Sequence, residues 1–115
     1  MPDLRESYTL PVERNETWET GPFATETAEC AWASEAIFFV RALRVSGDLS
    51  NVVARVQISP DGMHWVDEGT TLYLPTQAEE VTFAKVAHFG GWLRMVGEIP
   101  GGASITLIVY LTLKG

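Results

Sequence analysis

The chain has 115 residues, of which 46% are hydrophobic and 20% charged, a size and composition typical of one globular domain. Its net charge of −7 argues against nucleic acid as a partner, because an acidic surface repels a phosphate backbone. The single cysteine, Cys30, excludes both an internal disulfide and a zinc site built from several cysteines.

The sequence pattern predicts neither a membrane span nor a targeting segment. No apolar run approaches the roughly 18–20 residues that a transmembrane helix needs. The first residues lack the basic-then-apolar order of a secretory signal. We therefore expect no membrane span and synthesis in the cytoplasm, while the final location, an assembled particle or appendage included, stays open.

The first third of the chain carries most of the negative charge. Residues 1–35 contain eight acidic and two basic side chains, and apolar and polar residues alternate only weakly there. Pro11 and Pro22 favour edge strands or an extended segment. Two interpretations stay open, a solvated acidic surface and an arm that docks on a neighbouring subunit. We divide the chain into an extended acidic N-terminal arm with edge strands, residues 1–30, and a β-sandwich core, residues 31–115.

The sequence pattern in the middle of the chain predicts two strands and one shorter limb of a hairpin. Residues 36–45 are apolar on both faces as far as Arg41 and Arg44, which favours a central strand. Residues 51–59 alternate between apolar and polar side chains, as a half-buried strand requires. A short hairpin limb is expected around residues 70–74.

Three further strands are predicted in the last third, over residues 81–87, 92–97 and 104–114. The last of them is the strongest, because β-branched residues recur along it and its leucines fall on one face. Glycine and proline turns separate the segments. Seven or eight short strands at a spacing of roughly 8–12 residues predict an all-β fold, a single antiparallel β-sandwich that is jelly-roll-like.

The most distinctive local sequence is Ser59–Trp65, which reads Ser-Pro-Asp-Gly-Met-His-Trp. Proline presets the backbone of the second position of a turn, aspartate suits the third, and glycine releases the chain into the next strand. The structural interpretation is a hairpin turn whose tryptophan closes one end of the core. The functional interpretation is a ligand loop with an aromatic platform and polar neighbours.

This Ser-Pro-Asp-Gly-x-x-Trp stretch resembles the Ser-x-Asp-Gly-x-x-Trp turn that is frequent in discoidin-like and galactose-binding-like β-sandwiches. The segment Trp92-Leu93-Arg94-Met95 is similar to a strand with an aromatic residue and arginine late in such sandwiches. The resemblance covers about a dozen residues, and the chain lacks the cysteine pair of a discoidin domain. It implies a non-catalytic binding or assembly module.

A ligand-binding module would stack a carbohydrate on aromatic rings and bind its hydroxyls through nearby polar groups. Trp92 is expected to pack in the core because its strand alternates, whereas an exposed Trp18 or Trp32 would favour a protein interface. The candidate ligand-binding residues are Asp61, His64, Trp65, Trp92 and Arg94.

No catalytic motif is present in the sequence. Neither histidine, His64 or His88, lies in the context of a known catalytic motif. Cys30 is interpreted as buried or inert, because the neighbouring Glu29 raises rather than lowers a thiol pKa. The acidic residues around the Ser59–Trp65 turn are interpreted as solvated rather than as a calcium site. We expect no enzymatic activity, no cofactor and no metal.

The favoured hypothesis is a non-enzymatic structural subunit that self-associates into a shell, fibre, appendage or virion component. Its acidic arm would dock on arginines of a neighbour, which predicts an oligomer that loosens at high salt. The alternative is a carbohydrate- or ligand-binding module that uses the Ser59–Trp65 turn. Expected partners are copies of the chain or other structural subunits, or, in the alternative, a glycan. The residues assigned to the assembly interface are Trp18, Arg41, Arg44 and Arg55.

Overall fold

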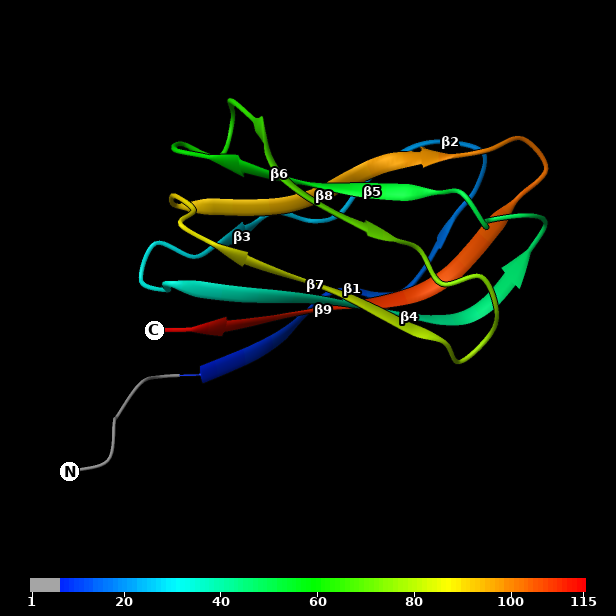
Figure 1. Ribbon diagram of the computed structural model, residues 1–115, viewed down its shortest axis with the longest axis horizontal. Coiled ribbons are helices and arrows are strands. Elements are labelled where there is room, and N and C mark those ends of the chain that lie inside the picture. The colour runs from blue at the N-terminus through cyan, green and yellow to red at the C-terminus, as the bar shows by residue number, and fades with distance from the viewer. Residues whose placement is uncertain (1–6) are drawn as a thin grey trace.

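The computed structural model describes residues 7–115 and shows two antiparallel sheets packed face to face (Figure 1). Sheet A has the strand order β1-β9-β4-β7, and sheet B has the order β2-β8-β5-β6, with β3 also paired to β8. The strands of sheet A are β1 (Ser7–Trp18), β4 (Glu35–Ser46), β7 (Val81–Ala87) and β9 (Ser104–Lys114). Those of sheet B are β2 (Gly21–Ala24), β3 (Ala28–Glu29), β5 (Val53–Ser59), β6 (Val66–Tyr73) and β8 (Trp92–Ile99).

The predicted jelly-roll-like sandwich is confirmed. β2 and β3 pair with successive parts of β8, so together they occupy one strand position. Each sheet then has four positions, and the chain crosses between the sheets at every connection except the one from β5 to β6. This is the strand order of a jelly roll. The nine segments exceed the expected seven or eight because the N-terminal third forms three strands.

The core lies between β4 and β9 of sheet A and the inner face of sheet B. Phe38 pairs with Leu111 and Val40 with Val109, and all four side chains are buried. Fully burying one such side chain stabilises the fold by about 1.5–3 kcal/mol. Residues 36–45 do form the predicted central strand, since β4 lies between β9 and β7.

The N-terminal segment is not an arm over the residues that the structure describes. β1 pairs with β9 of its own sheet from Ser7, opposite Lys114, to Trp18, opposite Ile105. Trp18 is buried and stacks on Phe23 of β2, with the ring centroids 4.2 Å apart. The physical reason is that the apolar side chains of β1 complete the core, and its backbone supplies the second neighbour that β9 needs. Residues 1–6 of the predicted arm lie outside the described residues.

A buried carboxylate ties β1 to the segment that follows it. Glu13 lies between two register shifts in the pairing of β1 with β9. Its Oε1 accepts a hydrogen bond of 2.8 Å from the backbone N–H of Glu26, between β2 and β3. Burial raises the pKa of Glu13, since water no longer solvates the charged form fully. Residues 7–35 of the acidic third are therefore part of the sandwich, not a layer added to it.

Replacing Gly97 with alanine tests how tightly β2 packs on β8. A Cβ at this position would lie 2.5 Å from the ring of Phe23, which is itself stacked on Trp18. We expect Gly97→Ala to lower the free energy of unfolding by about 1–3 kcal/mol, the range for overpacking a core. Urea unfolding measures it. Gly101→Ala is the matched control, because a Cβ there meets no atom within 4 Å; equal effects of both variants would contradict the packing argument.

Candidate functional site

The Ser59–Trp65 turn is organised around two side chains that bond to its own backbone. Ser59 Oγ accepts hydrogen bonds from the N–H groups of Asp61 (3.2 Å) and Gly62 (2.8 Å). Asp61 Oδ1 accepts the Ser59 hydroxyl (3.0 Å) and the N–H groups of Met63 (2.8 Å) and His64 (2.9 Å). Gly62 adopts a φ of 79°, which favours glycine. These residues therefore build the turn, as its structural interpretation predicts. The prediction that its tryptophan closes one end of the core is wrong, because Trp65 is not among the core residues and packs against Arg94.

The same contacts stabilise the ionised form of the Asp61 carboxyl. The backbone N–H of His64, then the His64 ring, lower the pKa of this carboxyl well below its usual range. Nδ1 of His64 lies 2.6 Å from Asp61 Oδ2. The imidazole stays open to solvent, with 80% of its side chain exposed. The Asp61 side chain is 40% exposed, so His64 offers a ligand the larger surface of the two.

The structure brings Trp65 and Arg94 together on the outer face of sheet B. The guanidinium carbon of Arg94 lies 4.3 Å from the Trp65 ring centroid, a cation–π contact. Arg94 Nε also donates a 2.9 Å hydrogen bond to Gln57 Oε1. The arginine therefore covers one face of the indole, which is half-buried.

Trp92 does not pack in the core as expected. Its neighbour Leu93 is fully buried, so the alternation of β8 turns Trp92 outward, to the same face as Arg94. The ring is half-buried because the turn lies over it: a Cβ on Gly62 would stand 3.2 Å from the indole. Trp92 therefore supports the turn from below.

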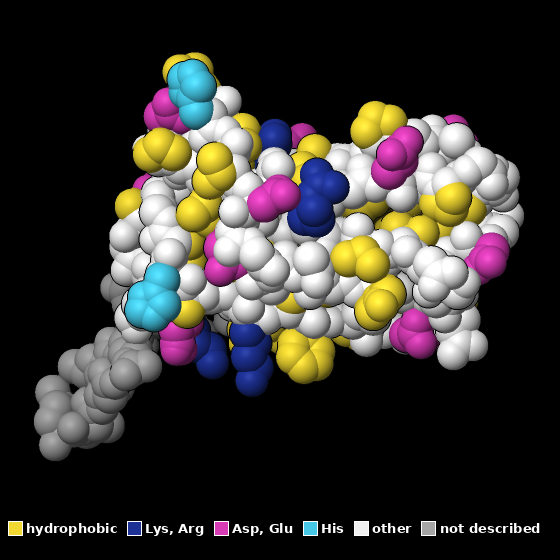
Figure 2. All heavy atoms as spheres, turned by 45° about the horizontal axis from the view of Figure 1, so that its top comes forward, with side chains coloured by type: hydrophobic (Ala, Val, Ile, Leu, Met, Phe, Trp, Pro, Cys, Tyr) yellow, Lys and Arg dark blue, Asp and Glu magenta, His cyan; other side chains and the backbone are white. Residues whose placement is uncertain are grey.

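A polar row continues from Arg94 across sheet B. Gln57 pairs in register with Arg94 of β8 and with Asp67 of β6, and its Nε2 donates a 3.0 Å hydrogen bond to Asp67 Oδ1. Arg55 Nε lies 3.4 Å from the same oxygen. The hydrogen bond from Gln57, with Arg55 nearby, lowers the pKa of Asp67. Figure 2, which turns this side forward, shows charged groups of both signs among hydrophobic ones.

The residues assigned to the assembly interface do not meet in one place. Trp18 is buried, so the prediction that it is an exposed interface residue is wrong. Arg41 bonds Glu79 at 2.6 Å and Arg55 faces Asp67, so both guanidinium groups already have a carboxylate of their own chain. Arg44 is exposed and lines a shallow hollow on sheet A. An acidic arm has no prepared arginine cluster to bind.

Cys30 is buried, as the sequence interpretation expects. Its side chain has no exposed surface, and Sγ lies 3.7 Å from the carbonyl oxygen of Gly90. Burial, followed by the charge of Glu29, raises the pKa of the thiol to about 11. A thiol of this kind is a poor nucleophile.

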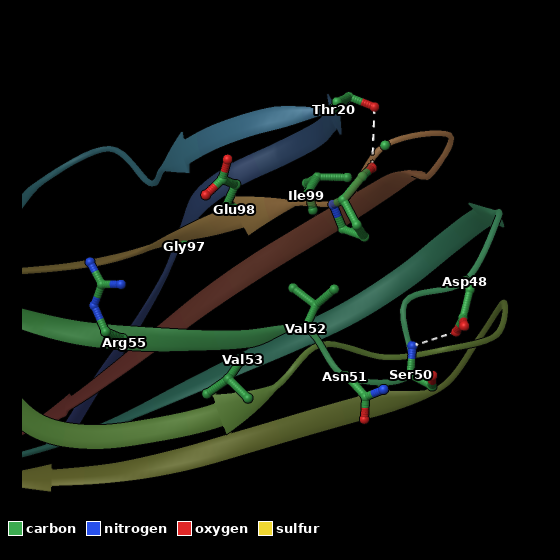
Figure 3. Close-up of a pocket in the computed structure, with 12 residues that line it drawn as sticks. Thr20, Asp48, Ser50, Asn51, Val52, Val53, Arg55, Gly97, Glu98 and Ile99 are labelled. Atoms are coloured by element: carbon green, nitrogen blue, oxygen red, sulfur yellow. Dashed lines mark hydrogen bonds between the residues drawn. The ribbon is translucent and has the colours of Figure 1, made fainter.

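A hollow lies at the other end of the sandwich (Figure 3). It has a volume of about 630 Å³ and opens between the loops that follow β4 and β8. Two of its polar groups are occupied locally: Asp48 Oδ1 accepts the Ser50 N–H at 2.9 Å, and the Thr20 hydroxyl donates to the Pro100 carbonyl at 3.2 Å. Over residues 7–115, no group of three or more His, Cys, Asp or Glu side chains is placed to hold a metal ion.

The surface that sequence reasoning missed is an aromatic row on the outer face of sheet A. Phe39 of β4 stands in register between Tyr110 of β9 and Phe83 of β7, and Tyr110 pairs with Pro11 of β1. The Phe39 and Phe83 ring centroids are 6.2 Å apart, and Phe83 is 58% exposed. We call these four residues, three aromatic side chains and Pro11, the aromatic row. The apolar outer face of residues 36–45 was the signal for it, but it was interpreted only as the mark of a central strand.

No helix within residues 7–115 is long and apolar enough to cross a membrane.

Replacing Asp61 with alanine tests whether its carboxylate holds the turn. Since the pKa of Asp61 is lower in the folded chain than the unfolded value of about 3.9, its contribution is present above about pH 4. It is lost as the pH falls through the folded value. We expect Asp61→Ala to unfold at lower urea than the wild type at neutral pH, with the gap closing in acid. Met63→Ala, in the same turn but 74% exposed, should leave stability unchanged at every pH; a gap for Asp61→Ala that stayed constant into acid would contradict the charge argument.

Comparison with known proteins identifies the fold. No protein-family model matches the sequence, and no curated protein matches it. Among solved structures, SPBc2 prophage-derived protein YomS is similar, with a TM-score of 0.58 over 100% of this chain and 98% of that chain. The two sequences are 9% identical, so the similarity is one of fold. The chain is a jelly-roll β-sandwich that shares its architecture with a prophage-derived protein.

Proposed function

We propose that this chain is a non-enzymatic structural subunit of a phage-derived assembly, which associates with copies of itself through sheet A. The observation that carries the proposal is the aromatic row. Soluble proteins seldom expose contiguous apolar surface without a partner for it. Here Pro11, Tyr110, Phe39 and Phe83 line up across all four strands of one sheet, on the face turned away from the core.

The two outer faces of the sandwich differ in a way that supports this choice. The outer face of sheet B carries the polar row of Arg94, Gln57 and Asp67, in which each side chain has a partner. In the aromatic row of sheet A, Phe39 packs against Phe83, and the end of the row at Phe83 is open to solvent. A face that stayed in water would gain nothing from such side chains, whereas a buried interface is enriched in aromatic residues.

The fold supports a phage context. The similar protein YomS is described as prophage-derived, and viral capsid proteins use jelly rolls. Lectins use the same architecture, so the fold by itself does not choose between assembly and ligand binding. The choice between assembly and ligand binding therefore rests on the side chains of the outer sheet faces.

A second candidate, a carbohydrate-binding module, is favoured by the grouping of side chains at the Ser59–Trp65 turn. His64 is held by Asp61 and exposed, and Trp65 is half-buried against Arg94. One indole face and one imidazole next to it suit the stacking and hydrogen bonding of a sugar ring. The resemblance of the turn to discoidin-like modules points the same way.

The mass of the protein in solution tests the assembly proposal. Contacts through an apolar face are not screened by ions, so we expect an oligomer on a sizing column with light scattering at both ~0.1 M and ~1 M salt. This replaces the salt-sensitive oligomer that an acidic arm predicts. Phe39→Ser should lower the mass, while Val53→Ser, on the outer face of sheet B, should not. A wild-type monomer of 12.7 kDa at both salts would refute self-association.

A panel of immobilised glycans tests the second candidate. If the turn binds sugar, Trp65→Ala should abolish binding to every glycan that the wild type retains. Trp32→Ala is the control, because this exposed tryptophan lies outside the Ser59–Trp65 turn. Binding that survives Trp65→Ala, or is lost equally in both variants, would exclude the turn as the site.

A further inference from the structure

The strands at the sheet edges of the described chain differ in how well they are protected against pairing with another chain. Natural proteins protect an edge with proline, bulges, charged residues or a short strand. β1 contains Pro11 and two register shifts, and β2 is four residues long with Pro22. β6 has a register shift against β5 and two acidic residues, Asp67 and Glu68.

β7 has fewer of these protections, and Lys85 is its one charged residue. It pairs with β4 over seven residues without a register shift, and its sequence, Val-Thr-Phe-Ala-Lys-Val-Ala, has no proline, glycine or acidic residue. Val81 is 51% exposed and Phe83 58% exposed. A regular, apolar edge of this kind is a template for another strand.

The direction of the free backbone groups on β7 follows from its contacts with β4. Ala42 N–H donates to the Glu80 carbonyl at 3.0 Å, and the Ala42 carbonyl accepts the Glu79 N–H at 2.8 Å. Hydrogen-bonding directions alternate along an antiparallel strand. Residues 82, 84 and 86 therefore face β4, and Val81, Phe83 and Lys85 direct their N–H and C=O groups to the open side.

We propose that β7 binds β7 of a second copy of this chain, antiparallel about a two-fold axis at Phe83. This rests on the proposed function, since it names the strand through which the subunits associate. In this register Phe83 stands opposite Phe83 of the second copy, and Val81 stands opposite its Lys85. These are the residues whose backbone groups face the open side, so each pair exchanges both hydrogen bonds. The two copies of sheet A become one continuous sheet.

Two side-chain features fit this register. Directly opposite residues lie on the same face of a sheet, so the aromatic row of one copy runs on into that of the second across the Phe83 pair. β7 carries no acidic residue, so no two carboxylates face each other across the paired strands.

A proline at the edge and a cysteine at the axis test the pairing. Val81→Pro removes an N–H that faces the open side, at the first position of the strand, where proline is tolerated. We expect it to keep the wild-type circular dichroism and to lower the mass measured by light scattering. Phe83→Cys should form a covalent dimer with a short bismaleimide, because Cys30 is buried and does not compete. Tyr73→Cys, 62% exposed on β6, is the matched control and should stay monomeric on a denaturing gel.

The outcomes separate this inference from the proposed function. A wild-type oligomer whose mass is unchanged in Val81→Pro would overturn the strand pairing and leave self-association standing. A mass lowered by Val81→Pro, together with a Phe83→Cys protein that keeps the wild-type mass by light scattering but does not cross-link, would overturn the two-fold register. A wild-type protein that is monomeric throughout would overturn both.

Discussion

The pairing of β9 with β1 on one side and β4 on the other is the constraint on which the rest of the structure depends. The inner face of β9 carries Ile105, Leu107, Val109, Leu111 and Leu113, all buried. A strand so apolar must have both its backbone edges and its inner face covered, since unpaired backbone groups are costly next to a core. β4 supplies one edge and β1 the other, which is why the N-terminal segment folds onto its own chain.

The same strand links the core to the outer surface. Because side chains alternate, the register that buries Leu111 against Phe38 also sets Tyr110 beside Phe39 on the opposite face. A slip of one residue would turn the leucines into water and the aromatic residues into the core. The aromatic row is thus held in place by the full stability of the sandwich, and its geometry does not depend on a loop. Rigid placement of this kind lowers the entropy cost of association.

Most of the strands can be predicted from short stretches of sequence, whereas most of the surface depends on residues that are distant in the sequence. The period-two alternation predicted β5, β7, β8 and β9 close to their observed bounds, because each strand buries one face. Trp18 was misjudged because its burial depends on a strand distant in sequence: its neighbour Thr17 bonds Thr106, 89 positions along the chain, at 2.9 Å. The residues near Trp18 in the sequence do not show which distant strand pairs with its own.

The candidate surfaces likewise divide into one that neighbouring residues in the sequence predict and one that requires the fold. The Ser59–Trp65 turn was recognised from its own residues, because turn chemistry is local. The aromatic row takes one residue from each of four strands, so it exists only once the register is known. One indication of it was present in β4, whose two apolar faces predicted a central strand. Sheet B covers one face, and within residues 7–115 nothing covers the other.

An unprotected edge next to an apolar face is costly to a protein that stays alone, since both promote aggregation. The chain protects β1 with Pro11 and register shifts, and it places a bonded polar row on the outer face of sheet B. On β7 the register is regular, and Lys85 is the one charged residue. The proposed two-fold pairing would cover this edge and extend the aromatic row across both copies in one step.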